Sequence, residues 1–146
     1  MIHRTAPSAA FVVLVLSGID HWTVSSTSPA LRDLPGVTNA VISRLQAAGL
    51  ENVFRIARSP VAELAYRANL SPDDARAAHE AARLVTLRGI GTAHAAALIG
   101  GGVASIEELA RSDPDSVWRR VRGDRGARPT IAEVRVWVHA AEGAVR

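Results

Sequence analysis

The sequence predicts an all-α protein built from two related helical units, and three observations support this. Downstream of residue 31, apolar residues recur at three- and four-residue spacing instead of alternating. Capping residues precede several of these stretches. Residues 34–59 also align with residues 87–112 without a gap, and eight positions are identical. We therefore expect tandem repeats that form one compact helical domain after a short apolar N-terminal segment.

Residues 1–30 differ in character from the rest of the chain and are expected to form an apolar N-terminal segment followed by a polar linker. The apolar run at residues 9–16 is too short to span a bilayer as a helix, so we expect no membrane span. Phe11–Leu16 is rich in β-branched residues, which favours a buried strand or an oligomer contact. A secretory signal and a poorly ordered tail remain alternatives. We expect a cytoplasmic protein, with secretion as the open alternative.

The two units are expected at residues 31–86 and 87–146, with the first unit degenerate. In each, the sequence predicts a glycine turn between helices, then a short helix, then a longer closing helix. The paired segments share glycines and apolar positions, as a common backbone requires. No stretch after Leu31 has the alternating pattern of a strand.

Capping residues place the ends of the predicted helices. Ser71 before Pro72 opens a closing helix over residues 72–86. Thr130 with Glu133 forms a predicted capping box for a second one. This second closing helix is expected over residues 131–142. Ser105 and Glu108 predict a further capping box, and Asp113 precedes an expected short helix. The expected core residues of the closing helices are Ala75, Ala78, Ala82, Val85, Ile131, Val134, Val138 and Ala141.

The turn of the second unit lies in the stretch LRGIGTAHAAAL, which starts at Leu87. Leu87 and Ile90 are apolar anchors, and Gly89 and Gly91 permit backbone angles that a side chain disfavours. A helix beginning near Thr92 leaves several backbone amides without an intrahelical acceptor. Such amides, with the helix dipole behind them, favour binding of an anion.

This stretch resembles the helix-hairpin-helix motif, a DNA-binding element without sequence preference whose glycine turn contacts backbone phosphates. The matching residues are Leu87, Gly89, Ile90, Gly91, Ala95 and Leu98. The resemblance implies that double-stranded DNA is the partner. In the first unit, Thr38 replaces the second glycine, so Gly36, Thr38 and Asn39 are weaker candidates.

Residues 31–142 are similar as a whole to an uncharacterised bacterial family of tandem helix-hairpin-helix domains. The segment GGVASIEELA at residues 101–110, Pro129 and Trp137 carry this similarity. It implies the fold but no assigned activity. We expect Trp118 and Trp137 to pack in the core or against the turns.

Arginine supplies all seventeen basic residues, and the excess of positive charge lies in residues 111–146. The loop WRRVRGDRGARP at residues 118–129 concentrates five arginines against the single acid Asp124. Arginine binds phosphate through two parallel hydrogen bonds, and each such contact adds a salt-dependent increment of affinity. The candidate nucleic-acid-binding residues are therefore Arg88, Gly89, Ile90, Gly91, Thr92, His94, Arg119, Arg120, Arg122, Arg125 and Arg128.

Several classes of function are disfavoured. The chain has no cysteine and no lysine, which excludes thiol chemistry, Schiff-base lysines and the phosphate-loop lysine. We expect no catalytic residues, no cofactor and no metal site, because the histidines lack ligand spacing and the acids do not cluster. The prediction is a non-catalytic module that binds duplex DNA backbone. The alternative is a protein-interaction or self-assembly module in which Phe11–Leu16 makes the contact and the turns are only structural.

Overall fold

The computed structural model describes residues 29–123 and 128–146, which in these ranges are all-helical and contain no strand. The all-α prediction is thereby confirmed. The N-terminal segment with its expected strand or interface lies outside the described residues. The elements are η2 (Leu31–Asp33), α2 (Asn39–Ala47), α3 (Val53–Arg58), α4 (Val61–Arg67), α5 (Pro72–Thr86), α6 (Gly91–Gly100), α7 (Ile106–Ala110), α8 (Pro114–Val121) and α9 (Ile131–Ala144).

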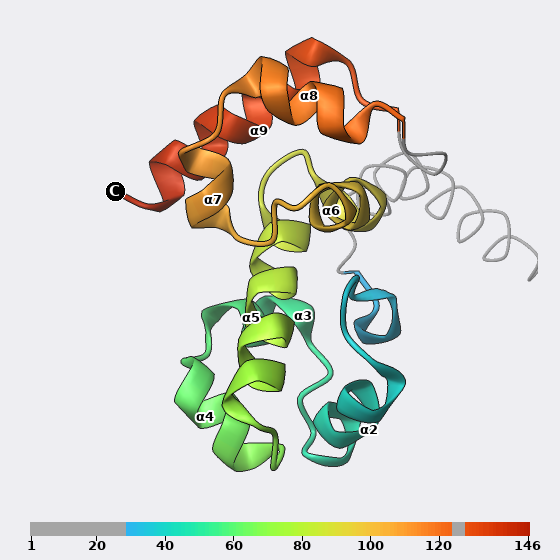
Figure 1. Cartoon of the computed structure of the whole chain (residues 1–146). Coiled ribbons are helices and arrows are strands. Elements are labelled where there is room, and N and C mark those ends of the chain that lie inside the picture. Colours follow the sequence, from blue (N-terminus) through green and yellow to red (C-terminus); the bar gives the residue numbers. More distant parts are fainter. Residues whose placement is uncertain (1–28, 124–127) are drawn as a thin grey trace, which may run out of the picture.

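Helix α5 is the central element of the fold. Figure 1 shows α2, α3 and α4 gathered around its lower part and α6, α7, α8 and α9 around its upper end. Helices α3 and α4 pack along α5, and α9 packs against α7 and α8. The second turn, which we define as residues 87–90, joins the upper end of α5 to α6. The position of this turn between the two groups of helices decides which side chains surround it.

Most helices begin where the sequence places a capping residue. The Ser71 hydroxyl accepts a hydrogen bond from the Asp74 amide at 3.1 Å, and Asp113 caps α8 in the same way. Thr130 forms a complete capping box at the start of α9. At the start of α7, the Ser105 hydroxyl accepts a hydrogen bond from the Glu108 amide and also donates to the Glu108 carboxylate at 3.4 Å. In a complete capping box, that carboxylate would accept from the Ser105 backbone amide instead. The capping box predicted there is thus only half formed.

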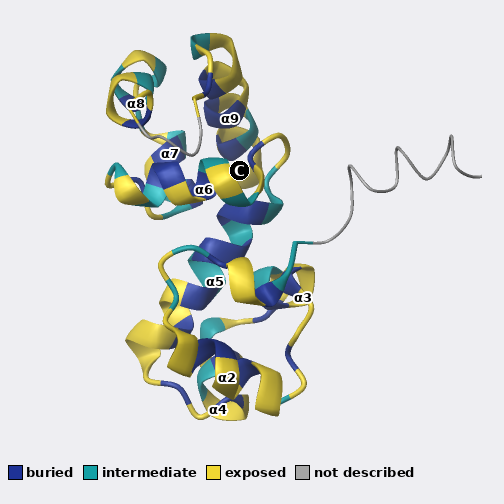
Figure 2. Cartoon of the chain, turned by 90° about the vertical axis from the view of Figure 1, so that its right-hand side faces the viewer, coloured by how far each residue is buried: buried dark blue, intermediate teal, exposed yellow. Residues whose placement is uncertain are grey.

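The core is made mainly of leucine, isoleucine, valine and alanine, in keeping with the low aromatic content. Buried residues follow α5 through its length, whereas exposed residues dominate the outer surfaces of α2 and α4 (Figure 2). All of the expected core residues of the closing helices are buried except Ile131, which is half-buried. Alanines on α5 let neighbouring helices approach closely. The largest fully buried side chain is Trp137 of α9.

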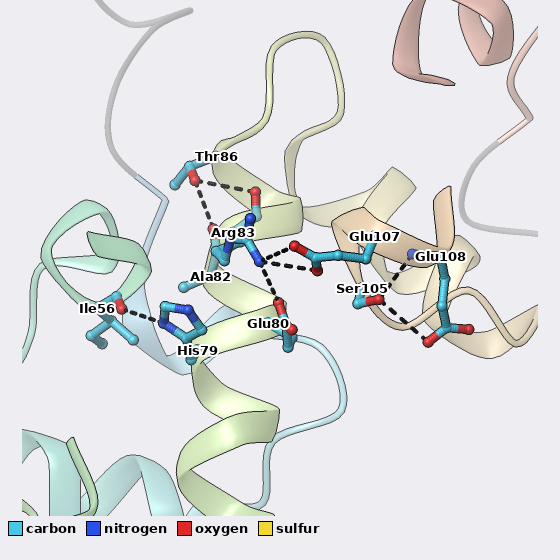
Figure 3. A network of polar contacts seen from close by, with 9 residues as sticks. All are labelled: Ile56, His79, Glu80, Ala82, Arg83, Thr86, Ser105, Glu107 and Glu108. Atoms are coloured by element: carbon cyan, nitrogen blue, oxygen red, sulfur yellow. Dashed lines mark hydrogen bonds and ion pairs between the residues drawn. The ribbon is translucent and has the colours of Figure 1, made fainter. Parts of the chain in front are cut away.

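Polar contacts from α5 tie both groups of helices to it (Figure 3). The His79 ring donates from Nδ1 to the Ile56 carbonyl of α3 at 3.1 Å. Arg83 donates to both carboxylate oxygens of Glu107 on α7, at 3.1 and 3.0 Å, and to Glu80 on its own helix. Partial burial raises the pKa of Glu107, but the hydrogen bonds and charge of Arg83, a backbone hydrogen bond and the charge of Arg111 together outweigh it and hold that pKa below its ordinary value.

The backbone repeats features at the spacing found in the sequence. Gly36 and Gly89 lie 53 residues apart, and both have a positive φ, +74° and +84°. Gly49 and Gly102 are related by the same spacing, with φ of +76° and +91°. Helices α3 and α7 also begin 53 residues apart. Equivalent left-handed positions explain why glycine is present at both members of each pair.

Candidate nucleic-acid interface

Two exposed glycines, one in the second turn and one at the first residue of α6, have a conformation that side chains disfavour. Gly89 and Gly91 have φ of +84° and +71°, and both are exposed. Ile90 between them is only 4% exposed, so it anchors the turn to the core. The Ile90 amide donates to the Leu87 carbonyl at 3.1 Å, which closes the turn. Leu87, the other expected anchor, is half-buried.

Helix α6 begins directly after this turn without a side-chain cap from any described residue. By contrast, a side chain caps α2, α3, α5, α7, α8 and α9. The first amides of a helix have no intrahelical acceptor, and the macrodipole places partial positive charge at that end. The first turn of α6 also contains no acidic residue. An anion can therefore approach this end of α6 without competing with a capping side chain.

Trp137 and His94 hold the second turn from its inner side. The indole Nε1 of Trp137 donates to the Gly89 carbonyl at 3.0 Å, and the residue is only 1% exposed. The His94 ring lies 4.7 Å from the Trp137 ring and donates from Nδ1 to the Ile90 carbonyl at 3.0 Å. Trp137 thus packs against the turn as expected, and His94 is half-buried.

The N-terminal part of α9 contributes one carboxylate to these surroundings. A hydrogen bond from the Thr130 backbone amide holds the pKa of Glu133 below its ordinary value, and the charge of His94 acts in the same direction. The carboxylate accepts that amide at 2.9 Å as part of the capping box. Glu133 is therefore ionised at neutral pH and oriented toward the start of its own helix.

The first turn, residues 34–38, has a different arrangement at its helix start. The Thr38 hydroxyl accepts from the Val41 amide at 3.3 Å and so occupies one of the free amides of α2. A Cβ atom on Gly36 would lie 3.4 Å from the Ile99 side chain of α6. Asn39, the remaining weaker candidate, is exposed. The first turn therefore packs against α6, and the helix that follows it, α2, is capped by Thr38.

Arg120 at the end of α8 lies at the opposite end of α6 from Gly91. Arg120 donates from Nη1 to the Gly101 carbonyl at 3.3 Å. At 1.5 Å per residue, this end lies about 15 Å from the start of α6. The Arg122 guanidinium stacks over the Trp118 ring at 5.0 Å. Arg119 and Arg128 are exposed, and Arg125 lies outside the described residues.

The second turn with Arg88, Thr92 and His94 therefore lies apart from Arg120 at the end of α8, so the candidate residues do not all form one continuous cluster. Their separation follows from the packing of α8 across the end of α6 that contains Gly101. Sequence spacing cannot reveal this distance, because it depends on how two non-adjacent helices pack.

A hollow of about 640 Å³ opens beside the second turn. It is lined by the turn and the start of α6, by Phe54 of α3 and by Pro29. Of the described residues that line it, Arg88 is a permanent cation and none is acidic. Sequence reasoning did not single out Phe54. A signal was available in the sequence, because Phe54 lies between the apolar Val53 and Ile56 of a short helix. Only one face of such a helix can be buried, so Phe54 could have been predicted to point away from Val53 and Ile56.

None of the helices in the described ranges has the length and apolar character that a bilayer crossing requires. A family model described as "Domain of unknown function (DUF4332)" matches residues 35–143, and the chain belongs to this family. Comparison with curated proteins and with solved structures gave no match.

Proposed function

We propose that this chain is a non-catalytic tandem helix-hairpin-helix module that binds the backbone of duplex DNA without sequence preference. The observation that carries the proposal is the start of α6, where the exposed left-handed Gly89 precedes a helix that begins with the exposed left-handed Gly91 and has no side-chain cap. Backbone amides at such a position bind a phosphate oxygen by hydrogen bonds and by the helix dipole. Contacts to phosphate carry no direct base information, so no sequence preference is expected.

The contacts behind the second turn support this proposal because they fix its shape. Trp137 and His94 each hydrogen-bond a carbonyl of the turn, at 3.0 Å in both cases. These two hydrogen bonds hold the turn from its inner side, while Gly89 and Gly91 remain exposed. A preorganised loop loses little conformational entropy when it binds. The exposed guanidinium of Arg88 is next to Gly89 and adds a second, charged contact to the same phosphate.

The arginines at the end of α8 extend the proposed footprint. The end of α8 reaches Gly101, about 15 Å from the start of α6, so an arginine beside it would reach a different phosphate from the one at the second turn. Arg119 is exposed and suited to this contact. Arg120 is engaged with the Gly101 carbonyl, so we assign it to the stability of the helix end instead.

The test is the affinity for a labelled blunt duplex, measured by fluorescence anisotropy between about 50 and 200 mM salt. The logarithm of the association constant should fall linearly with the logarithm of salt concentration. Each phosphate contact contributes about −0.9 to that slope, so Arg88→Ala should make the slope less steep by about 0.9. Arg67→Ala is the matched control, because Arg67 lies on α4 and its loss changes the net charge equally.

Two outcomes of this salt titration would contradict the proposal. One is the absence of duplex binding even at the lowest salt concentration. The other is an identical change of slope in Arg88→Ala and Arg67→Ala, which would show that only net charge matters. Equal affinity for duplexes of unrelated sequence is expected, and a strong preference for one sequence would also refute backbone recognition.

A further inference from the structure

The hollow beside the second turn has the dimensions and lining of a ligand site. Its volume of about 640 Å³ falls within the range of about 300–1,000 Å³ that is usual for small-molecule sites. Residues from separate parts of the chain form it: the second turn, α6, and Phe54 of α3. A site assembled from distant segments requires the complete fold, unlike a contact made by one turn.

The lining combines an aromatic surface with an environment that favours negative charge. Phe54 is 36% exposed, and among the described residues the other exposed aromatic side chain of this kind is Tyr66 on α4, at 88%. The described lining contains Arg88 but no carboxylate. By comparison, the hollow between the first turn and α7 contains Asp73, Glu80 and Glu108. The hollow at Phe54 thus fits a ligand with both an anionic group and a flat apolar group.

We propose that this hollow binds an unpaired nucleotide, whose base stacks on Phe54 while its phosphate lies at the second turn. The inference rests on the proposed function, because it places the phosphate at the same turn. Aromatic side chains bind bases of any identity by stacking. A paired base is held in its base pair and stacked on its neighbours, so an unpaired base is the one that can enter the hollow and stack on Phe54. The favoured substrate class is therefore duplex DNA with a single-stranded end.

The experiment compares a blunt duplex with the same duplex bearing a short overhang that contains the fluorescent base 2-aminopurine. The full chain should bind the overhang duplex at least about fivefold more tightly, the lower end for stacking of one base on an aromatic residue. Stacking should also quench the 2-aminopurine fluorescence. Phe54→Leu keeps an apolar side chain but removes the stacking surface, so it should abolish both the preference and the quenching.

Tyr66→Leu is the matched control because it removes the other exposed aromatic residue, which lines a separate hollow with Val61 and Pro72. It should change neither quantity. Circular dichroism of both variants checks that α3 and α4 remain folded. Because blunt-duplex binding is assigned to the second turn and the contact of Phe54 only to an unpaired base, Phe54→Leu should leave the affinity for the blunt duplex unchanged.

The outcomes separate this inference from the proposed function. Equal affinity for both duplexes, or quenching that persists in Phe54→Leu, would overturn the nucleotide site and leave backbone binding intact. A less steep salt dependence in Arg88→Ala together with loss of the overhang preference in Phe54→Leu supports both. Absence of binding to either duplex would overturn both proposals.

Discussion

A negative charge at the start of α6 should affect stability and DNA binding in opposite directions. Thr92 is the second residue of α6, and the first turn of that helix has no acidic residue. Thr92→Glu places a carboxylate at the positive end of the helix dipole, which typically stabilises a protein by about 0.3–1 kcal/mol. For a domain of this size we expect the melting temperature to rise by about 1–4 °C.

The same carboxylate should repel a phosphate bound at the second turn. Two unit charges about 5 Å apart repel by about 1 kcal/mol in water and about 3 kcal/mol at the effective dielectric constant of a protein surface. The second turn is exposed, so the effect should lie between these limits. The affinity for blunt duplex DNA should therefore fall by about 5- to 150-fold. Anisotropy at fixed salt measures the affinity, and thermal melting followed by circular dichroism measures the stability.

Ala40→Glu is the matched control for this substitution. Ala40 is exposed and is the second residue of α2, a helix that also has no acidic residue in its first helical turn. It should stabilise α2 to a similar degree but reduce DNA affinity only through the change in net charge. If Thr92→Glu is folded and binds DNA as tightly as the unaltered chain, no phosphate lies at the start of α6. Equal losses of affinity in both variants would likewise refute the reasoning.

Three further predictions follow from individual contacts. Trp137→Phe removes the hydrogen bond to the Gly89 carbonyl and some buried volume, so urea denaturation should show a loss of about 1–3 kcal/mol. Arg120→Ala should lower the stability by up to about 1 kcal/mol and leave the salt slope of DNA binding unchanged, whereas Arg119→Ala should make that slope less steep by about 0.9 without loss of stability. Because the folded pKa of Glu107 lies below its unfolded value of about 4.3, its ion pair stabilises the protein above that pH and is lost as the pH falls through the folded pKa. Glu107→Gln should reduce the loss of folding free energy at acid pH by less than about 1 kcal/mol, since the Glu107 side chain is 42% exposed. An acid denaturation curve unchanged by this substitution would refute the role of the ion pair.

The helices could be predicted from sequence because their causes are local. Capping residues such as Ser71 and Thr130 act on amides two or three positions away, so the sequence contains all the information needed. The positive φ of Gly89 and Gly91 could be inferred for the same reason, since only glycine adopts it at little cost. The second closing helix continues to Ala144, beyond its expected end, and helix ends are the least sharply defined part of an element.

The surroundings of the second turn could not be predicted because they come from other helices. Trp137 lies 48 positions from the Gly89 carbonyl that accepts its hydrogen bond. Phe54 reaches the hollow from α3, and Arg120 contacts the far end of α6. Each contact depends on how helices pack, and apolar periodicity reports only which face of a helix is buried. The sequence thus indicated the residues of the turn but not the other groups that surround it.

The two turns show how one backbone pattern can serve different purposes. Thr38 and Gly91 are equivalent in the sequence alignment, yet their φ angles are −73° and +71°. With an extended backbone, Thr38 turns its hydroxyl toward the first amides of its own helix. The left-handed Gly91 has no side chain to do so, and a Cβ atom there would meet no atom within 4 Å. The absence of a cap at α6 is therefore not forced by crowding; with Trp137 holding the turn from inside, it leaves the amides open to an external anion.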